Sequence, residues 1–267
     1  MSTQHTQGVV RIISSYCDDF PNQTQNIMQM VRCAQISPDN TRKFARELQS
    51  ELHRMAGSAH CLGFRVIAQR LTRLEERLAR ALLRKGRESI GAISDVIESI
   101  VEFVAEVPRP SPQDSRLIDS NLLDESLSLP AEEIPEDQAG LAHLRILLID
   151  DDAHVLGVER ETLLAIGAED VEVANSGLEA LNRLSEVQPD LLITDWHMGA
   201  ISGPDLLNAI RNGSCGIDRN TPVIFFSHKR DRRSRMQMTM EGANYFLTKP
   251  VSPRVLGRAI SRAVSGS

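Results

Sequence analysis

The stretch Leu191-Leu192-Ile193-Thr194-Asp195 is a short apolar run that ends in a carboxylate. Three other apolar runs also end in polar groups: Ile146 to Ile149 before Asp150, Asp151 and Asp152; Val223 to Phe226 before Ser227; and Tyr245 to Thr248 before Lys249. Runs of this length, separated by segments of helical period, predict buried parallel strands. Ligands bind outside the carboxyl ends of the strands in such sheets, so we expect these polar groups to converge.

The converging groups indicate phosphoryl-transfer chemistry. Clustered carboxylates repel one another, so they either hold a proton or bind a hard cation such as Mg²⁺. A lysine and a hydroxyl opposite them suit phosphoryl oxygens. We therefore expect transfer of a phosphoryl group onto Asp195, in which Mg²⁺ and Lys249 neutralise developing charge and Ser227 positions an oxygen.

Residues 144 to 264 resemble the receiver domain of bacterial response regulators. The resemblance implies a flavodoxin-like domain with a parallel sheet of strand order 2-1-3-4-5. It also implies a two-state switch in which the hydroxyl and an aromatic residue move together. The implied roles are a metal-binding acid set at Asp150, Asp151 and Asp195, the phosphoacceptor at Asp195, catalytic groups at Lys249 and Ser227, and switch residues at Ser227 and Phe246.

Two departures from the receiver pattern concern loops beside the expected site. Gly199 stands where the family has a proline, and His228 stands where it has a small residue. We predict that His228, together with His197 and Lys229, modulates how fast water attacks the aspartyl phosphate. The alternative is that these three are merely exposed loop residues.

The N-terminal part predicts an antiparallel helical bundle. Apolar residues recur there at steps of three and four, which is typical of amphipathic helices joined by short connections. Gly63 and Gly86 suit helix ends. The expected core positions are Ile27 and Val31; Phe44, Leu48, Leu52, Met55, Ala59 and Leu62; Phe64, Ile67, Leu71, Leu74, Leu78 and Ala81; and Ile90, Ile93, Ile97, Ile100 and Val104.

His53 does not belong to these apolar stripes. A rotation of about 100° per residue places it roughly 150° from the centre of its helix's stripe, so we expect an exposed position shared with Gly57. The string from His53 to Gly63 resembles the histidine-containing phosphotransfer (HPt) motif, His-x-Leu-Lys-Gly-Ser-Ala. The resemblance implies that His53 is a second phosphoacceptor.

One residue departs from that motif. Ala56 replaces its lysine. We expect Arg42 and Arg46, on the same helix face, to supply the missing positive charge.

Three segments are expected along the chain. Residues 1–107 form the helical bundle, residues 108–142 a linker, and residues 143–267 the receiver-like domain. The expected linker is rich in proline and acidic residues, a composition that disfavours a packed core.

Composition limits the classes of function. The chain has 267 residues, a hydrophobic content of 41% and a formal net charge of -6, which argues against general nucleic-acid binding. No apolar run approaches the roughly 20 residues that span a bilayer, and the polar N-terminus is unlike a signal peptide. We therefore expect a cytoplasmic protein without membrane insertion. The 4 cysteines form no Cys-x-x-Cys pair, so reduced thiols are expected.

These features predict a phosphorelay intermediate rather than an enzyme: an HPt-like bundle fused to a receiver domain. No glycine motif for ATP is present, so the phosphoryl group must arrive on a partner. We expect a histidine kinase to phosphorylate Asp195, and His53 to exchange phosphoryl groups with Asp195 or with a separate receiver or HPt protein.

Two alternatives stay open. In the first, the receiver acts by protein–protein interaction and the helical domain is a docking module without transfer activity. In the second, Asp150-x-Asp152 is similar to the motif of haloacid-dehalogenase-type phosphatases, with Asp150 as nucleophile and Asp152 as acid or base.

Overall fold

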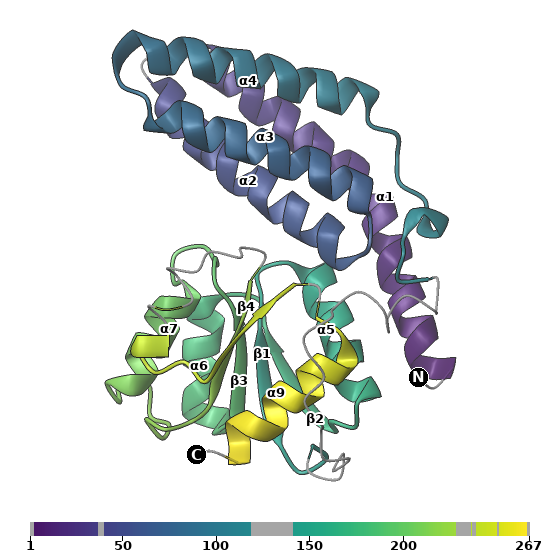
Figure 1. The fold of residues 1–267 in the computed structure, drawn as a ribbon, viewed down its shortest axis with the longest axis vertical. Helices are drawn as coiled ribbons and strands as arrows, with labels where there is room; N and C mark the ends of the chain where they lie inside the picture. The colour runs from purple at the N-terminus through teal and green to yellow at the C-terminus, as the bar shows by residue number, and fades with distance from the viewer. Residues whose placement is uncertain are drawn as a thin grey trace. The chain divides into compact units, whose positions relative to one another are not determined.

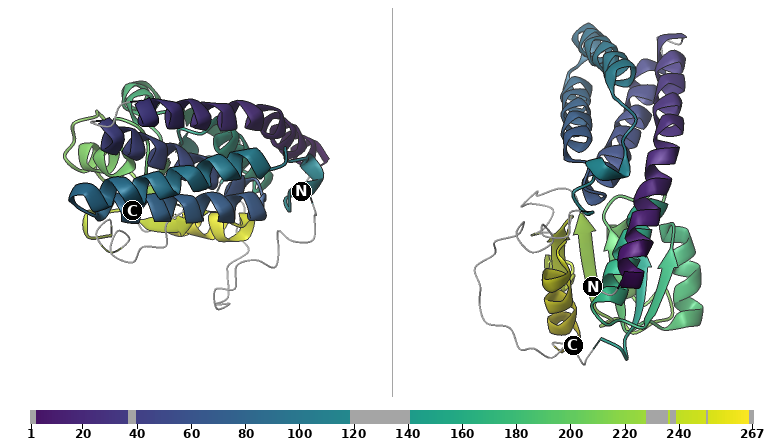
Figure 2. Two further views of the ribbon diagram at one scale, coloured as in Figure 1. Left: turned by 90° about the horizontal axis from the view of Figure 1, so that it is seen from above. Right: turned by 90° about the vertical axis from the view of Figure 1, so that its right-hand side faces the viewer.

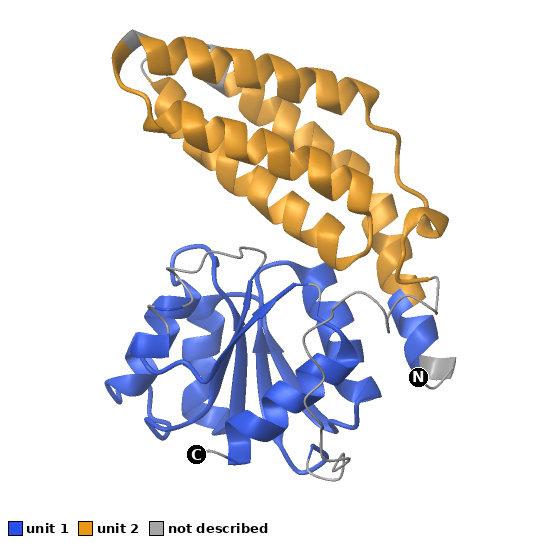
Figure 3. Cartoon of the chain, viewed as in Figure 1, with its two compact units in different colours: residues 1–9, 120–267 blue, residues 10–119 orange. Residues whose placement is uncertain are grey.

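The computed structural model describes residues 3–36, 40–118, 141–227, 236, 239–249 and 251–265. The chain divides into two compact units (Figure 3). The helical unit comprises Val10–Asp119, and the C-terminal unit comprises Ser120–Ser267 together with Met1–Val9. The expected segment boundaries stay a prediction, because most of the expected linker lies outside the described residues.

The helical unit is built from long amphipathic helices: α1 (Thr3–Ile36, which starts in the other unit), α2 (Thr41–Cys61), α3 (Arg65–Leu83) and α4 (Gly86–Glu106), followed by the short 3-10 helix η2 (Pro112–Asp114). Helices α2, α3 and α4 lie side by side with short connections (Figure 1). The expected stripe of α3 is buried throughout, and that of α2 is buried except for the half-buried Phe44. Gly63, just after α2, has a φ of +83°, as a glycine ending a helix allows.

The inner face of α4 differs from the expectation at its first turn. Ile90 is 45% exposed, whereas the preceding Ser89 is fully buried. The reason is a polar contact between helices: Ser89 Oγ donates to the carbonyl of Ala81 at 3.0 Å and accepts from Arg42 at 2.7 Å. A serine that satisfies a helix-end carbonyl therefore takes the inward position instead of the isoleucine.

Arg42 also has a different role from the expected one. Its guanidinium donates to the carbonyls of Leu82 and Arg84, at 2.7 and 3.0 Å, besides the hydroxyl of Ser89. The last carbonyls of α3 lack intrahelical donors, and Arg42 satisfies them. The expectation that Arg42 supplies charge to His53 is therefore wrong. Arg46 is exposed and stays a candidate.

The C-terminal unit has a flavodoxin-like sheet. All pairings between neighbouring strands are parallel, and the strand order β2-β1-β3-β4-β5 confirms the expected topology. The strands are β1 (Arg145–Ile149), β2 (Asp170–Ala174), β3 (Leu191–Asp195), β4 (Val223–Ser227) and β5 (Tyr245–Thr248).

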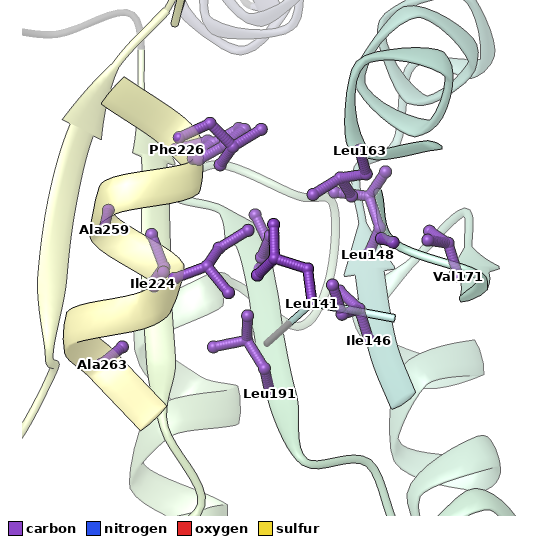
Figure 4. Close-up of a cluster of buried hydrophobic side chains, with 14 of the residues drawn as sticks. Leu141, Ile146, Leu148, Leu163, Val171, Leu191, Ile224, Phe226, Ala259 and Ala263 are labelled. Carbon is purple, nitrogen blue, oxygen red and sulfur yellow. The ribbon is translucent and has the colours of Figure 1, made fainter. Parts of the chain in front are cut away.

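Helices cover both faces of this sheet, as a parallel sheet requires. They are α5 (Ala153–Ala165), α6 (Gly177–Val187), α7 (Gly203–Arg211) and α9 (Pro253–Ser265). Buried residues of α5 and α9 pack against one face of the sheet, and those of α6 and α7 pack against the other. Figure 2 shows α9, in yellow, along one side of the sheet. The first cluster joins Leu148 and Ile224 of the strands to Leu163 and Ala259 of the helices (Figure 4). Among the described helices, none combines the length and apolar character that a membrane span requires.

Candidate functional site

The carboxyl ends of four strands carry the polar residues expected from the sequence. Asp195 ends β3 and Ser227 ends β4, while Asp150 and Lys249 directly follow β1 and β5. All four are buried, at 3% exposure for Asp150, 8% for Asp195, 2% for Ser227 and 3% for Lys249. In the sheet, Asp195 lies opposite Phe226, one residue before Ser227. The parallel topology therefore brings these groups to one edge of the sheet.

Lys249 is the centre of this cluster. Its ammonium group forms ion pairs with Asp150 Oδ2, with Glu159 Oε1 at 3.1 Å and with Asp195 Oδ1 at 3.2 Å. Within the described residues, one buried cation, Lys249, thus faces three carboxylates. Because buried charges require compensation, the negative excess favours binding of further positive charge or of protons at this edge.

Glu159 is a member of the cluster that was not predicted from the sequence. It lies on the buried face of α5 with Val155, Leu156 and Leu163. Burial, opposed by the ion pair with Lys249 and reinforced by repulsion from Asp195 and Asp152, raises the pKa of Glu159 to about 7. The available signal was a charged residue four positions after Val155 and four before Leu163, on the helix face that these apolar residues share.

The raised pKa of Glu159 predicts a pH-dependent stability. Its usual value is 4.5, so ionised Glu159 lowers the free energy of unfolding progressively between pH 4.5 and 7 and fully above pH 7. The decrease in the free energy of unfolding reaches about 3 kcal/mol at most. We expect Glu159→Gln to be more stable than the wild type at pH 8 and equally stable near pH 4. Urea unfolding followed by the fluorescence of Trp196, the single tryptophan of the chain, checks this; a variant less stable at pH 8 would contradict it.

The three consecutive acids after β1 have different environments. Asp150 Oδ1 accepts a hydrogen bond from the backbone N–H of Asp152 at 2.8 Å, and burial raises the pKa of Asp150 well above its usual value against the opposing effect of Lys249. Asp151 is exposed. Asp152 is the N-cap of α5, and its Oδ1 accepts from the N–H groups of His154 and Val155 at 3.0 and 3.1 Å. This capping role explains Asp152 without phosphatase chemistry.

The expected Mg²⁺ ligands fit the ion by their chemistry. Carboxylate oxygens are the ligands that Mg²⁺ prefers. Within the described residues, Asp195 Oδ1 is buried and accepts no hydrogen bond, although the Lys249 ammonium lies 3.2 Å away. Asp150, Asp151 and Asp195 are nevertheless not assembled as a ligand group: no cluster of three or more His, Cys, Asp or Glu in the described part of the chain could hold a metal ion.

An aromatic group lies next to this edge. Trp196 directly follows Asp195, and its ring centroid is 5.7 Å from that of Phe246 and 5.5 Å from that of Phe225. Phe246, the expected switch residue, also stacks on Phe225 at 6.3 Å. Trp196 was not among the site residues predicted from the sequence. Its position makes its fluorescence a natural reporter of changes around Asp195 and Phe246.

The expected modulating residues are only partly described. His197 is exposed, and its backbone N–H donates to Asp195 Oδ2 at 2.8 Å. His228 and Lys229 lie outside the described residues. Gly203, at the start of α7, passes so close to the strand that a Cβ there would meet the Asp195 carbonyl oxygen at 2.3 Å. This close approach requires glycine and fixes the loop that follows Asp195.

A second candidate site lies in the helical unit. His53 Nδ1 on α2 is 3.1 Å from Glu75 Oε2 on α3. The expected exposed position is only partly correct, because the His53 side chain is 19% exposed and Gly57 is buried. The close packing of α3 on α2 covers part of this face. Ala56 is buried too.

Glu75 is a second residue whose role was not predicted from the sequence. It occupies an inward position of α3 among Leu71, Leu74 and Leu78. A carboxylate on Nδ1 orients an imidazole and favours the form in which Nε2 carries the free lone pair. The contact therefore favours the tautomer of His53 in which Nδ1 carries the proton.

Comparison with known proteins points to the C-terminal unit. Residues 146–261 match the family described as "Response regulator receiver domain". The chemotaxis protein CheY1 of Helicobacter pylori is 30% identical over 114 residues, which are 42% of this chain and 90% of that protein. The chemotaxis protein CheY of Pseudomonas aeruginosa is 28% identical over 119 residues, 45% of this chain and 94% of that protein.

Two solved structures are also similar to part of this chain. A response regulator receiver domain protein from Clostridium thermocellum is 30% identical and covers 46% of this chain and 95% of its own, with a TM-score of 0.42. The receiver domain of the Francisella response regulator 1452 is 27% identical, with coverages of 46% and 99% and a TM-score of 0.42.

Proposed function

Because this chain belongs to the response regulator receiver family of two-component signalling, we propose that it is a phosphorelay intermediate with phosphoacceptors at Asp195 and His53. A histidine kinase is the proposed donor to Asp195. His53 is proposed to exchange phosphoryl groups with Asp195 or with a separate receiver or HPt protein. The contact of Lys249 with Asp150 and Asp195 at one buried edge carries the proposal for Asp195.

At Asp195, a carboxylate oxygen attacks the phosphorus of the donor. One P–O bond forms to Asp195 while the bond from phosphorus to the donor's imidazole nitrogen or oxygen breaks, and the leaving group keeps the electron pair. Lys249 neutralises charge on the transferred group, and Ser227 positions one of its oxygens. Mg²⁺ bound at the carboxylates of Asp150, Asp151 and Asp195, which the described residues do not assemble as a ligand group, would add charge neutralisation.

At His53, the proposed nucleophile is Nε2. Attack on an aspartyl phosphate forms a P–N bond and breaks the acyl P–O bond, so that the carboxylate leaves. The ring then carries a positive charge, which the Glu75 carboxylate stabilises through the Nδ1 proton. The 3.1 Å contact between Nδ1 and Oε2 supports this role.

One alternative has a structural observation in its favour. The half-burial of His53 and the absence of the motif lysine at the buried Ala56 would suit a helical unit that docks partners without accepting phosphate. Under this alternative, His53→Gln leaves signalling intact.

The proposal is tested by sorting the phosphoryl label on the intact chain. Wild type, His53→Gln and Asp195→Asn are incubated with a labelled small phosphodonor and Mg²⁺, alone and with an added phosphorylated receiver. Aspartyl phosphate is lost in alkali, whereas phosphohistidine survives alkali and is lost in acid. We expect alkali-labile label that requires Asp195 and alkali-stable label that requires His53.

Each outcome has a distinct meaning. Alkali-stable label that depends on both residues, in dilute protein without added receiver, supports exchange within the chain. Alkali-stable label that appears only with the added receiver supports exchange in trans. Label on Asp195 alone under both conditions favours the docking module, and no label on Asp195 refutes the relay.

A further inference from the structure

Glu159 is the carboxylate of the cluster with no part in the proposed chemistry. It lies on α5 and contacts Lys249, whereas the other carboxylates that pair with Lys249 come from the ends of β1 and β3. We propose that Glu159 is a positioning residue that restrains the ammonium group of Lys249 and slows phosphorylation of Asp195. This inference rests on the proposed role of Asp195 as phosphoacceptor.

The geometry makes Glu159 and Asp195 competitors for one cation. The Lys249 Nζ atom lies 3.1 Å from Glu159 Oε1 and 3.2 Å from Asp195 Oδ1, and it also pairs with Asp150. When Asp195 gains a phosphoryl group, the oxygens of that group need the same ammonium. Glu159 therefore has to give up part of its ion pair as the transfer proceeds.

The negative charge of Glu159 also opposes phosphorylation of Asp195. Phosphorylation adds negative charge to an edge that already holds the buried carboxylates of Asp150 and Glu159. Repulsion between like charges in a buried site is screened weakly. An ionised Glu159 therefore raises the free energy of the phosphorylated state and of the transition state that leads to it.

The charge state of Glu159 depends on pH in the neutral range. The groups that act on it are Lys249 after β5, Asp195 at the end of β3, Asp150 after β1 and Asp152 at the start of its own helix. With a pKa of about 7, Glu159 is mostly neutral at pH 6 and mostly ionised at pH 8. The restraint on Lys249 should therefore be strong at pH 8 and weak at pH 6.

The test compares wild type and Glu159→Gln in the full chain. Phosphoramidate and Mg²⁺ are added, and the rate of Asp195 phosphorylation is followed by Trp196 fluorescence and by alkali-labile label. We expect Glu159→Gln to react about five- to tenfold faster than wild type at pH 8, with a ratio that approaches one at pH 6. Taking the ratio at each pH removes the titration of the donor.

Controls separate this role from a structural one. Glu186→Gln makes the same change at an exposed position of α6 and should react like wild type at every pH. Glu159→Ala should also react faster at pH 8, and unfolding curves show that each variant is folded. A ratio of one or less at pH 8, or a ratio that is independent of pH, would overturn the inference.

The two proposals fail in different ways. Alkali-labile label on wild type together with an unaccelerated Glu159→Gln overturns the role of Glu159 alone. Absence of alkali-labile label from wild type and from every Glu159 variant overturns the phosphoacceptor role of Asp195 and the role of Glu159 with it.

Discussion

Lys249→Met should reduce phosphorylation of Asp195 by at least about 100-fold and destabilise the C-terminal unit by about 3–5 kcal/mol at pH 8. The side chain of methionine fills a similar volume but leaves Asp150, Glu159 and Asp195 buried without their cation. The slower phosphorylation and the lower stability both follow from the loss of the Lys249 positive charge. Label incorporation and urea unfolding followed by Trp196 fluorescence measure them separately.

The pH dependence of the stability of Lys249→Met distinguishes a loss of charge from a loss of packing. Protonation of the carboxylates that have lost the Lys249 ammonium restores neutrality, so the loss of stability in Lys249→Met should become smaller as the pH falls from 8 to 5. Lys249→Arg retains the charge and should recover much of the stability, but its planar guanidinium replaces a point charge, so the phosphorylation rate should stay low. A Lys249→Met protein as stable as wild type at pH 8 would contradict the central role of the ammonium group.

Glu75→Gln should slow phosphorylation of His53 by about 100-fold while leaving phosphorylation of Asp195 unchanged. A glutamine amide can donate to Nδ1, which favours the form with the proton on Nε2, and it cannot stabilise the positive charge on the phosphorylated ring. The measurement is the rate at which alkali-stable label appears after a phosphorylated receiver is added.

Glu76→Gln is the matched control for this change. Glu76 is the next residue of α3 and is exposed, so the same loss of one charge there should leave the rate as in wild type. Equal rates for Glu75→Gln and wild type would show that the contact with His53 does not assist transfer. A variant in which both His53 and Asp195 lose label would indicate a wider structural effect.

The fold of the C-terminal unit was predictable because its strands are continuous apolar runs. Leu191–Asp195 and Val223–Ser227 are buried along their whole length, so hydrophobicity alone marks them. Their polar final residues were therefore visible, and the parallel topology that the family implies places these residues together. The helical unit was predictable from the period of its apolar residues, because that period determines which face of each helix is buried.

The remaining features depend on contacts between distant segments. Glu75 and Glu159 occupy apolar positions of their helices, and only the structure shows that each faces a partner, His53 or Lys249. Arg42 was misjudged because its helix face was considered without the end of α3, whose carbonyls it binds. Periodicity describes one helix at a time and carries no information about which group stands opposite.

The position of β5 has a consequence for how the site can be lost. In the part of the chain that the structure describes, β5 is an edge strand that pairs only with β4, and its residues are half-buried. Edge strands detach at a lower free energy than central ones, and β5 leads directly into Lys249. Fraying of this strand would withdraw the ammonium from Asp150 and Asp195 while β1 and β3 stay paired. Reactivity toward a phosphodonor therefore measures the integrity of the sheet's edge, and it should disappear in partly opened molecules whose central strands are still intact.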